Sequence, residues 1–143
     1  MADGRWQMAE PLMSAWMAGN CSWMRDFRKI VAWQRADRLV DLVYTVAEAL
    51  PLDERFGLAS QLKRAAVSIA ANIAEGAGRA SDLDFERFLS IAAGSASELQ
   101  NHLGFVVRRW PDISTTSEAL GLAHEVKRML WSLLMASRAN RTS

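Results

Sequence analysis

Apolar residues recur every three or four positions through most of this chain, which is the spacing of a helix that packs along one face. The first such run extends from Phe27 to Leu50. Pro51 ends it, because the residue before a proline is pushed out of helical geometry. A second run extends from about Leu58 to Ala77. The core positions expected from these two runs are Ala36, Val40, Val43, Ala47, Leu50, Leu58, Leu62, Ala65, Ile69, Asn72 or Ile73, and Gly76.

Two further runs follow with the same period. The third spans about Asp82 to Arg109 and ends at Trp110 and Pro111, and the fourth begins among the polar residues 114–117. No segment alternates with a period of two, as a strand would. Four long helices joined by short loops predict an all-α fold, an antiparallel up-down-up-down four-helix bundle. We expect the bundle to occupy residues 25–138 and the polar tail 139–143 to fray.

Residues 1–24 have a different character and are expected to form a poorly ordered N-terminal extension. They show no sustained helical period, and a regular pattern begins directly after Met24. Two interpretations stay open: Met24 is the natural start and the preceding residues are a translated leader, or the segment is a flexible extension. The tryptophans and methionines of this segment are Trp6, Trp16, Trp23, Met1, Met8, Met13, Met17 and Met24.

The break between the second and third helices, within residues 61–99, is the most informative part of the chain. Its polar and glycine residues are Asn72, Glu75, Gly76, Gly78, Arg79 and Ser81. The glycines are expected to end a helix in the left-handed conformation. Ser81 precedes Asp82 and Asp84, the pattern of a helix N-cap with acidic residues in the first turn. Glu75 and Arg79 are four residues apart and are expected to pair. This segment therefore predicts the corner of a helical hairpin rather than an active site.

Composition and cysteine content exclude several kinds of site. The 143 residues are 50% hydrophobic and 23% charged, with a net charge of +1, an ordinary globular balance. Cys21 is the only cysteine, which rules out an internal disulfide and a cysteine metal cluster. His102 and His124 cannot form a zinc site alone, and we expect both at a surface or an interface. We therefore predict no metal and no cofactor.

The sequence also gives little support to catalysis or to a membrane location. The acidic residues near the corner are better explained as helix caps than as an acid–base pair. No histidine lies at a spacing that would activate a serine. No run is long and apolar enough to cross a membrane, and the N-terminus lacks the basic start of a secretory signal. We expect a cytoplasmic protein that is not an enzyme.

Basic residues gather in the first half of the first helix. Residues 25–38 hold five basic residues against two acidic ones, a local charge of +3. Arg28, Arg35 and Arg38 share a helix face, which could contact phosphates. The other interpretation is a solvated face that keeps the protein soluble. The candidate nucleic-acid-binding residues are Arg28, Lys29, Arg35, Arg38, Lys63 and Arg64.

Small residues are the second feature that suggests a partner. They leave more than one face of the second and third helices without bulk, so we expect a second apolar face and self-association through it. These residues are Ala65, Ala66, Ala70, Ala71, Ala74, Ala92, Ala93, Gly94 and Ala96.

The stretch from Phe27 to about Val107 resembles the 23S ribosomal RNA intervening-sequence proteins, a family of four-helix bundles similar to the accessory variability protein of diversity-generating retroelements. The pieces that carry the resemblance are Phe27-Arg28 with Trp33-Gln34, Phe56-Gly57-Leu58 with Gln61-Leu62, Arg64 to Ile69, Asn72-Ile73-Ala74-Glu75-Gly76, Gly78-Arg79, and Phe88-Leu89 with Gly94-Ser95. The resemblance implies a homopentamer with a central channel that associates with structured RNA or with a nucleic-acid enzyme. Members of the family commonly have proline at the position of Ala70, and they tend to begin near Met24.

Together these patterns predict a non-enzymatic, oligomeric bundle that associates with structured RNA or a nucleic-acid-processing partner through its basic faces. The alternative is a protein-binding adaptor that docks a larger enzyme through its alanine-rich helix faces.

Overall fold

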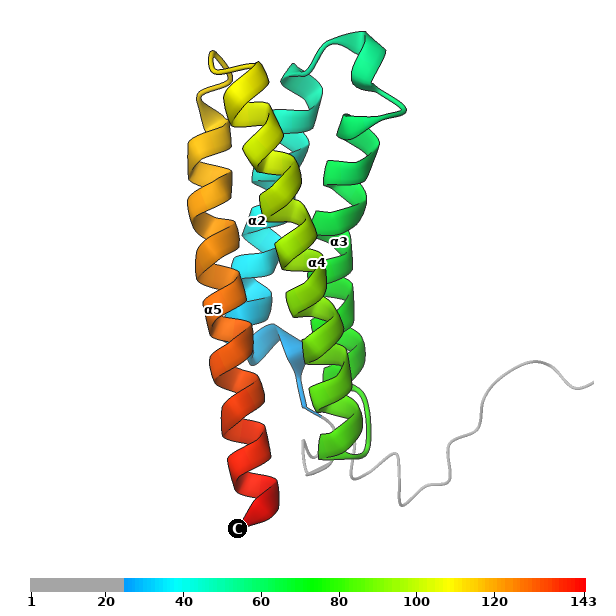
Figure 1. Cartoon of the computed structure of the whole chain (residues 1–143). Helices are drawn as coiled ribbons and strands as arrows, with labels where there is room; N and C mark the ends of the chain where they lie inside the picture. The colour runs from blue at the N-terminus through cyan, green and yellow to red at the C-terminus, as the bar shows by residue number, and fades with distance from the viewer. Residues whose placement is uncertain (1–24) are drawn as a thin grey trace, which may run out of the picture.

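The computed structural model describes residues 25–143, which form a bundle of four α-helices (Figure 1). Successive helices run in opposite directions, and the segments that join them are short. Two single-turn 3₁₀ helices complete the chain: η1 precedes the first long helix and η2 follows it. No strand occurs in residues 25–143. The elements are η1 (Phe27–Lys29), α2 (Val31–Ala49), η2 (Leu52–Glu54), α3 (Leu58–Ala77), α4 (Asp82–Arg109) and α5 (Thr115–Thr142).

The predicted all-α four-helix fold is confirmed, and the limits of α3 and α4 coincide with the predicted ones. The other two helices differ at one end each. The first helix begins at Val31 rather than Phe27, because Asp26 caps the separate turn η1 and Ile30 then adopts an extended conformation. The last helix continues through the predicted frayed tail 139–143 as far as Thr142. The predicted extension 1–24 lies outside the described residues.

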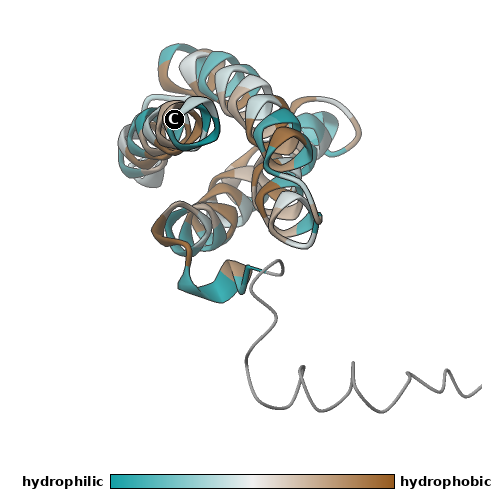
Figure 2. Ribbon diagram, turned by 90° about the horizontal axis from the view of Figure 1, so that it is seen from below, coloured by the Kyte–Doolittle hydropathy of each residue, from teal (hydrophilic) through white to brown (hydrophobic). Residues whose placement is uncertain are grey.

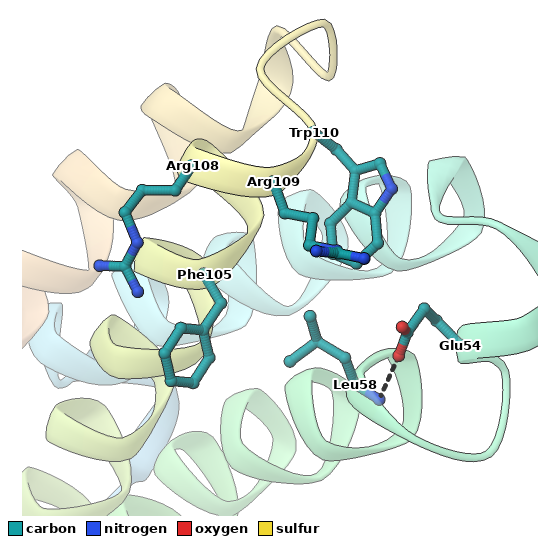
Figure 3. A pocket seen from close by; sticks show the side chains of 6 residues that line it. All are labelled: Glu54, Leu58, Phe105, Arg108, Arg109 and Trp110. Atoms are coloured by element: carbon teal, nitrogen blue, oxygen red, sulfur yellow. Dashed lines mark hydrogen bonds between the residues drawn. The ribbon is translucent and has the colours of Figure 1, made fainter.

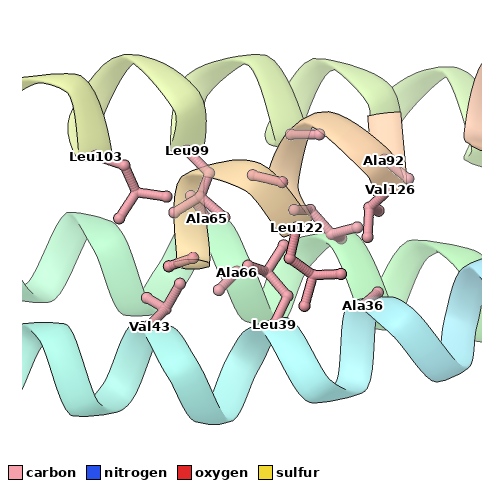
Figure 4. Packing of buried hydrophobic residues seen from close by; sticks show 14 of the residues in the cluster. Ala36, Leu39, Val43, Ala65, Ala66, Ala92, Leu99, Leu103, Leu122 and Val126 are labelled. Atoms are coloured by element: carbon pink, nitrogen blue, oxygen red, sulfur yellow. The ribbon is translucent and has the colours of Figure 1, made fainter. Parts of the chain in front are cut away.

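The four helices enclose one apolar core (Figures 2 and 4). Each helix packs against two neighbours: α2 lies between α3 and α5, and α4 also contacts both of these. Most of the expected core positions are buried, but Val40 is only half-buried, while Leu39 and Val46 on the same helix are fully buried. Over part of α2, the residues that face the core are therefore displaced by one position from the predicted ones.

The small residues of α3 and α4 mostly serve this core and do not form the predicted second face. Ala65 and Ala66 on α3, like Ala92, Ala93 and Ala96 on α4, are buried inside a single chain. Each helix needs two unbulky faces because it has two neighbours within the bundle. Of the remaining small residues, Ala70 and Ala74 are half-buried, and Ala71 and Gly94 are exposed.

Candidate nucleic-acid interface

The six basic candidates do not form one continuous surface. Arg28 and Lys29 lie in η1, Arg35 and Arg38 lie on the side of α2 that meets α5, and Lys63 and Arg64 lie on α3. Because α3 and α5 flank α2 on different sides, the α2 pair and the α3 pair belong to different faces of the bundle.

The two arginines of α2 are engaged with acidic residues of α5. Arg35 Nε lies 3.7 Å from a carboxylate oxygen of Glu125, and an Arg38 nitrogen donates to Glu118 at 3.0 Å. All four side chains are partly exposed. These pairs link α2 to α5 and balance the charge of the arginines, so the predicted phosphate-binding pair also holds two helices together.

Arg28 and Lys29 both expose their side chains to solvent. The Arg28 side chain is 73% exposed; one of its nitrogens lies 4.0 Å from Asp26, and its guanidinium lies over the Phe27 ring. Lys29 is exposed and forms no ion pair within residues 25–143. Trp33, near the start of α2, packs edge-on against Phe27, with the ring centres 4.9 Å apart. The cationic end of α2 is therefore available to a phosphate, but its tryptophan is already in contact with the chain.

Lys63 and Arg64 border a shallow hollow between α2 and α3. The Lys63 ammonium lies 4.9 Å from the centre of the Tyr44 ring, a cation–π contact. Arg64 is exposed and unpaired within the described residues. Val67 and Ser68 complete the lining of the hollow.

The predicted structural corner between α3 and α4 is built from local caps and one close contact. Ser81 is the N-cap of α4 and accepts a hydrogen bond from the Asp84 backbone N–H at 3.1 Å. Arg79 donates to Glu75 at 2.8 Å, as the spacing predicted. Asn72, one turn earlier, donates to the Ser68 carbonyl at 2.7 Å.

The prediction of a left-handed glycine at this corner is wrong. Gly78 ends α3 in the right-handed region, at φ −80° and ψ −4°. Gly76 is buried inside α3, where a Cβ atom would lie only 2.8 Å from the Cβ of Phe88. Glycine is required here for close helix packing and not for its backbone freedom.

The N-terminal strap, residues 25–30, closes over this corner. The Arg25 backbone N–H donates to the Ala77 carbonyl at 3.1 Å, and its guanidinium pairs with Asp82 and lies over the Phe85 ring. The acidic side chains near the corner thus act in caps and ion pairs, as the capping interpretation expected.

A groove that the sequence analysis did not identify opens at the other end of the bundle (Figure 3). It lies between the start of α3 and the end of α4 and has a volume of about 780 Å³. The only sequence signal for it is the arginine pair followed by tryptophan at the end of the third helix. Its lining residues are Glu54, Leu58, Phe105, Arg108, Arg109 and Trp110.

Comparison with known protein families places this bundle. The family model described as "23S rRNA-intervening sequence protein" matches residues 28–132. The chain belongs to this family. No curated protein matches it. The match contains all six basic candidates, the corner and the groove, and it ends before the last three turns of α5.

One buried carboxylate, that of Glu86, is hydrogen-bonded by residues of α5 that lie beyond the matched range. Glu86 on α4 is 4% exposed. Its carboxylate accepts hydrogen bonds from Ser137 at 3.1 Å and from two nitrogens of Arg141 at 3.2 Å, and Arg138 lies 3.9 Å away. Arg141 holds the pKa of the Glu86 carboxyl below its usual value, and Ser137 and Arg138 act in the same direction against the effect of burial. The hydrophobic pattern gave no sign of this contact.

His102 also differs from expectation. It is 9% exposed, not a surface residue, and its Nε2 lies 3.3 Å from Glu98 while its Nδ1 has no hydrogen-bond partner within residues 25–143. His124 is exposed as expected, with Nδ1 2.9 Å from Gln100.

Residues 25–143 contain no group of three or more histidine, cysteine, aspartate or glutamate side chains that could hold a metal ion. None of the helices in this range has a stretch apolar and long enough to traverse a bilayer.

Proposed function

We propose that this protein is a non-enzymatic, oligomeric helical bundle that associates with structured RNA or with a nucleic-acid-processing partner. The observation that carries the proposal is the family match over residues 28–132, since the family is described by a ribosomal RNA element. The exposed basic side chains would bind the phosphates of the RNA, since lysine and arginine contacts to phosphates dominate the affinity of proteins for nucleic acid.

Within the predicted set, we propose that Arg28, Lys29 and Arg64 make the main phosphate contacts. All three are exposed; Lys29 and Arg64 form no ion pair among the described residues, and Arg28 has only a long one, 4.0 Å to Asp26. Arg35 and Arg38 contribute less, because a phosphate would have to compete with Glu125 and Glu118. Lys63 keeps its charge accessible above the Tyr44 ring.

Charge reversal at the strap tests this assignment. The double variant Arg28→Glu with Lys29→Glu should bind a hairpin RNA at least about tenfold more weakly, because it removes two phosphate contacts and adds repulsion. Equilibrium filter binding measures the change. The matched control is Arg87→Glu with Lys127→Glu, which alters the net charge equally on α4 and α5, outside the candidate set. Equal losses in the two double variants would contradict the assignment.

We also propose that the chain forms a homopentamer, as the resemblance implied. Two large apolar side chains beside η2 support an assembly, because Leu52 is 86% and Phe56 is 89% exposed on the single chain. Sedimentation equilibrium should give about five times the chain mass of 15.9 kDa. A mass of one chain at micromolar concentration would contradict it.

The alternative function, a protein-binding adaptor, has less support, because it relied on alanine-rich surfaces. The alanine-rich faces that were expected to dock an enzyme are largely buried in the bundle. An adaptor would have to use other apolar residues, such as Phe56.

A further inference from the structure

The groove between the start of α3 and the end of α4 combines aromatic rings with positive charges that are unpaired within residues 25–143. Phe105 on α4 is 42% exposed, and Trp110, just after α4, is half-buried and donates its backbone N–H to Val106. Figure 3 shows the Phe105 ring and the Leu58 side chain on facing elements, with the two arginines above them. The groove therefore has an apolar floor and an open, cationic rim.

Each arginine at the rim lies over a ring. The Arg108 guanidinium is 5.2 Å from the centre of the Phe105 ring, and the Arg109 guanidinium is 5.8 Å from that of Trp110. Neither arginine forms an ion pair within residues 25–143. A guanidinium that lies over a ring keeps N–H groups free to bind an anion.

Glu54, the acidic residue that lines the groove, already accepts a hydrogen bond from the chain. Glu54 Oε2 accepts from the Leu58 backbone N–H at 3.4 Å and so lies at the positive N-terminus of α3. Its charge is directed to the helix end and not to the arginines. The lining thus presents two free positive groups to a ligand.

We propose that this groove binds unpaired nucleotides of RNA, with Phe105 as the stacking surface and Arg108 and Arg109 on the flanking phosphates. The proposal rests on the proposed function and adds a second contact to it, at the opposite end of the bundle from Arg28. Aromatic side chains accept only bases that have left a helix stack, so the groove selects loops or single strands over continuous duplex.

Binding of two RNA probes by the full chain tests the proposal. The probes are a labelled oligouridylate of about twelve nucleotides, which spans the usual single-strand site size, and a blunt RNA duplex of equal length. The variants are Phe105→Leu, which keeps an apolar side chain, and Arg108→Ala with Arg109→Ala. Their controls are Ile91→Ala and Arg87→Ala, exposed positions on α4 outside the groove. Thermal melting by circular dichroism verifies that every variant is folded.

The expected results are specific to the single strand. Phe105→Leu should weaken oligouridylate binding roughly 5- to 160-fold, the factor for losing one base–aromatic stack. The double arginine variant should reduce the slope of log affinity against log salt by about 1.4, since each phosphate contact contributes about 0.7 on single strands. Both controls should match the unchanged protein, and duplex binding should be unaffected by Phe105→Leu.

Three results would overturn the proposal. If the unchanged chain binds the hairpin RNA of the previous section but the groove variants behave as their controls, the groove assignment fails and the proposed function survives. If the chain binds neither probe nor the hairpin, both fail together. If a polyglutamate peptide containing phenylalanine binds through the two arginines while oligouridylate does not, the groove serves a protein partner.

Discussion

Gly76 lies where α3 packs tightly against α4, with no room for a side chain. A Cβ atom at this position would be 2.8 Å from the Phe88 Cβ and 3.2 Å from Phe85 Cδ2. Gly94, in the middle of α4, has no atom within 4 Å of the same added group. Gly76 therefore lies in a tightly packed part of the bundle, whereas Gly94 faces open space on the single chain.

The two glycines should respond to alanine with opposite signs. Gly76→Ala should lower the free energy of unfolding by about 1–3 kcal/mol, the usual cost of overpacking. Gly94→Ala should raise it by up to about 1 kcal/mol, because alanine is the better helix former where space is free. Urea unfolding measures both. A Gly76→Ala protein as stable as the parent would show that the corner can open without cost.

Glu86 makes stability depend on pH in a defined direction. Because Arg141 holds the folded-state pKa of this carboxyl below its usual value, the contact stabilises the fold above the unfolded-state pKa of about 4.3. The contribution is lost as pH falls through the folded-state pKa, when the carboxyl takes up a proton.

Arg141→Ala should therefore lower the melting temperature at pH 7, and the difference from the parent should shrink at a pH well below 4. Arg87→Ala, the exposed neighbour of Glu86 on α4, is the control and should have little effect at either pH. A melting difference for Arg141→Ala that is the same at both pH values would contradict the pairing.

At the scale of elements, the parts predicted correctly were those defined by local signals. The limits of α3 and α4 follow from apolar spacing and from a capping serine that lies within three residues of its partner. The sequence predicted that the tail 139–143 frays, whereas α5 continues to Thr142 and Arg141 binds Glu86, which is 55 residues away in sequence; no local pattern carries that contact.

The candidate basic residues show the same difference between local features, which the sequence predicts, and contacts between helices, which it does not. Spacing placed Arg35 and Arg38 on one face of α2, as predicted, but Arg28, which was expected on the same helix face, lies in η1 before α2 begins. Spacing also could not reveal that the face of Arg35 and Arg38 meets Glu125 and Glu118 of α5. The groove was missed because it joins Leu58 to Phe105, and a periodic pattern records each helix by itself.

The N-cap serines of α4 and α5 differ in whether the side chain forms a capping hydrogen bond. Ser81→Ala should lower the free energy of unfolding by about 1 kcal/mol, because the Asp84 N–H loses its acceptor. Ser114 occupies the same position before α5, but its side chain forms no capping hydrogen bond. Ser114→Ala should change stability less, as urea unfolding can establish. Equal losses at the two sites would refute the capping role of Ser81.

At the scale of the whole molecule, the bundle encloses one apolar core and presents separate charged regions outside. The strap residues Arg28 and Lys29 lie at one end, and Arg108 and Arg109 lie at the other. With a net charge of only +1, the protein has no overall field that would attract RNA, so affinity has to come from these local groups. In a closed oligomer each region would be repeated around the ring.

We propose that the protein binds RNA by replacing counterions at phosphates, and a salt titration distinguishes this from apolar docking. Binding of a hairpin RNA to the full chain is measured between about 50 and 200 mM salt. We expect log affinity to fall linearly with log salt, with a slope steeper than about −2, and to flatten in the Arg28→Glu, Lys29→Glu variant. An affinity that does not change with salt would contradict the claim, because it is the behaviour of an apolar docking surface.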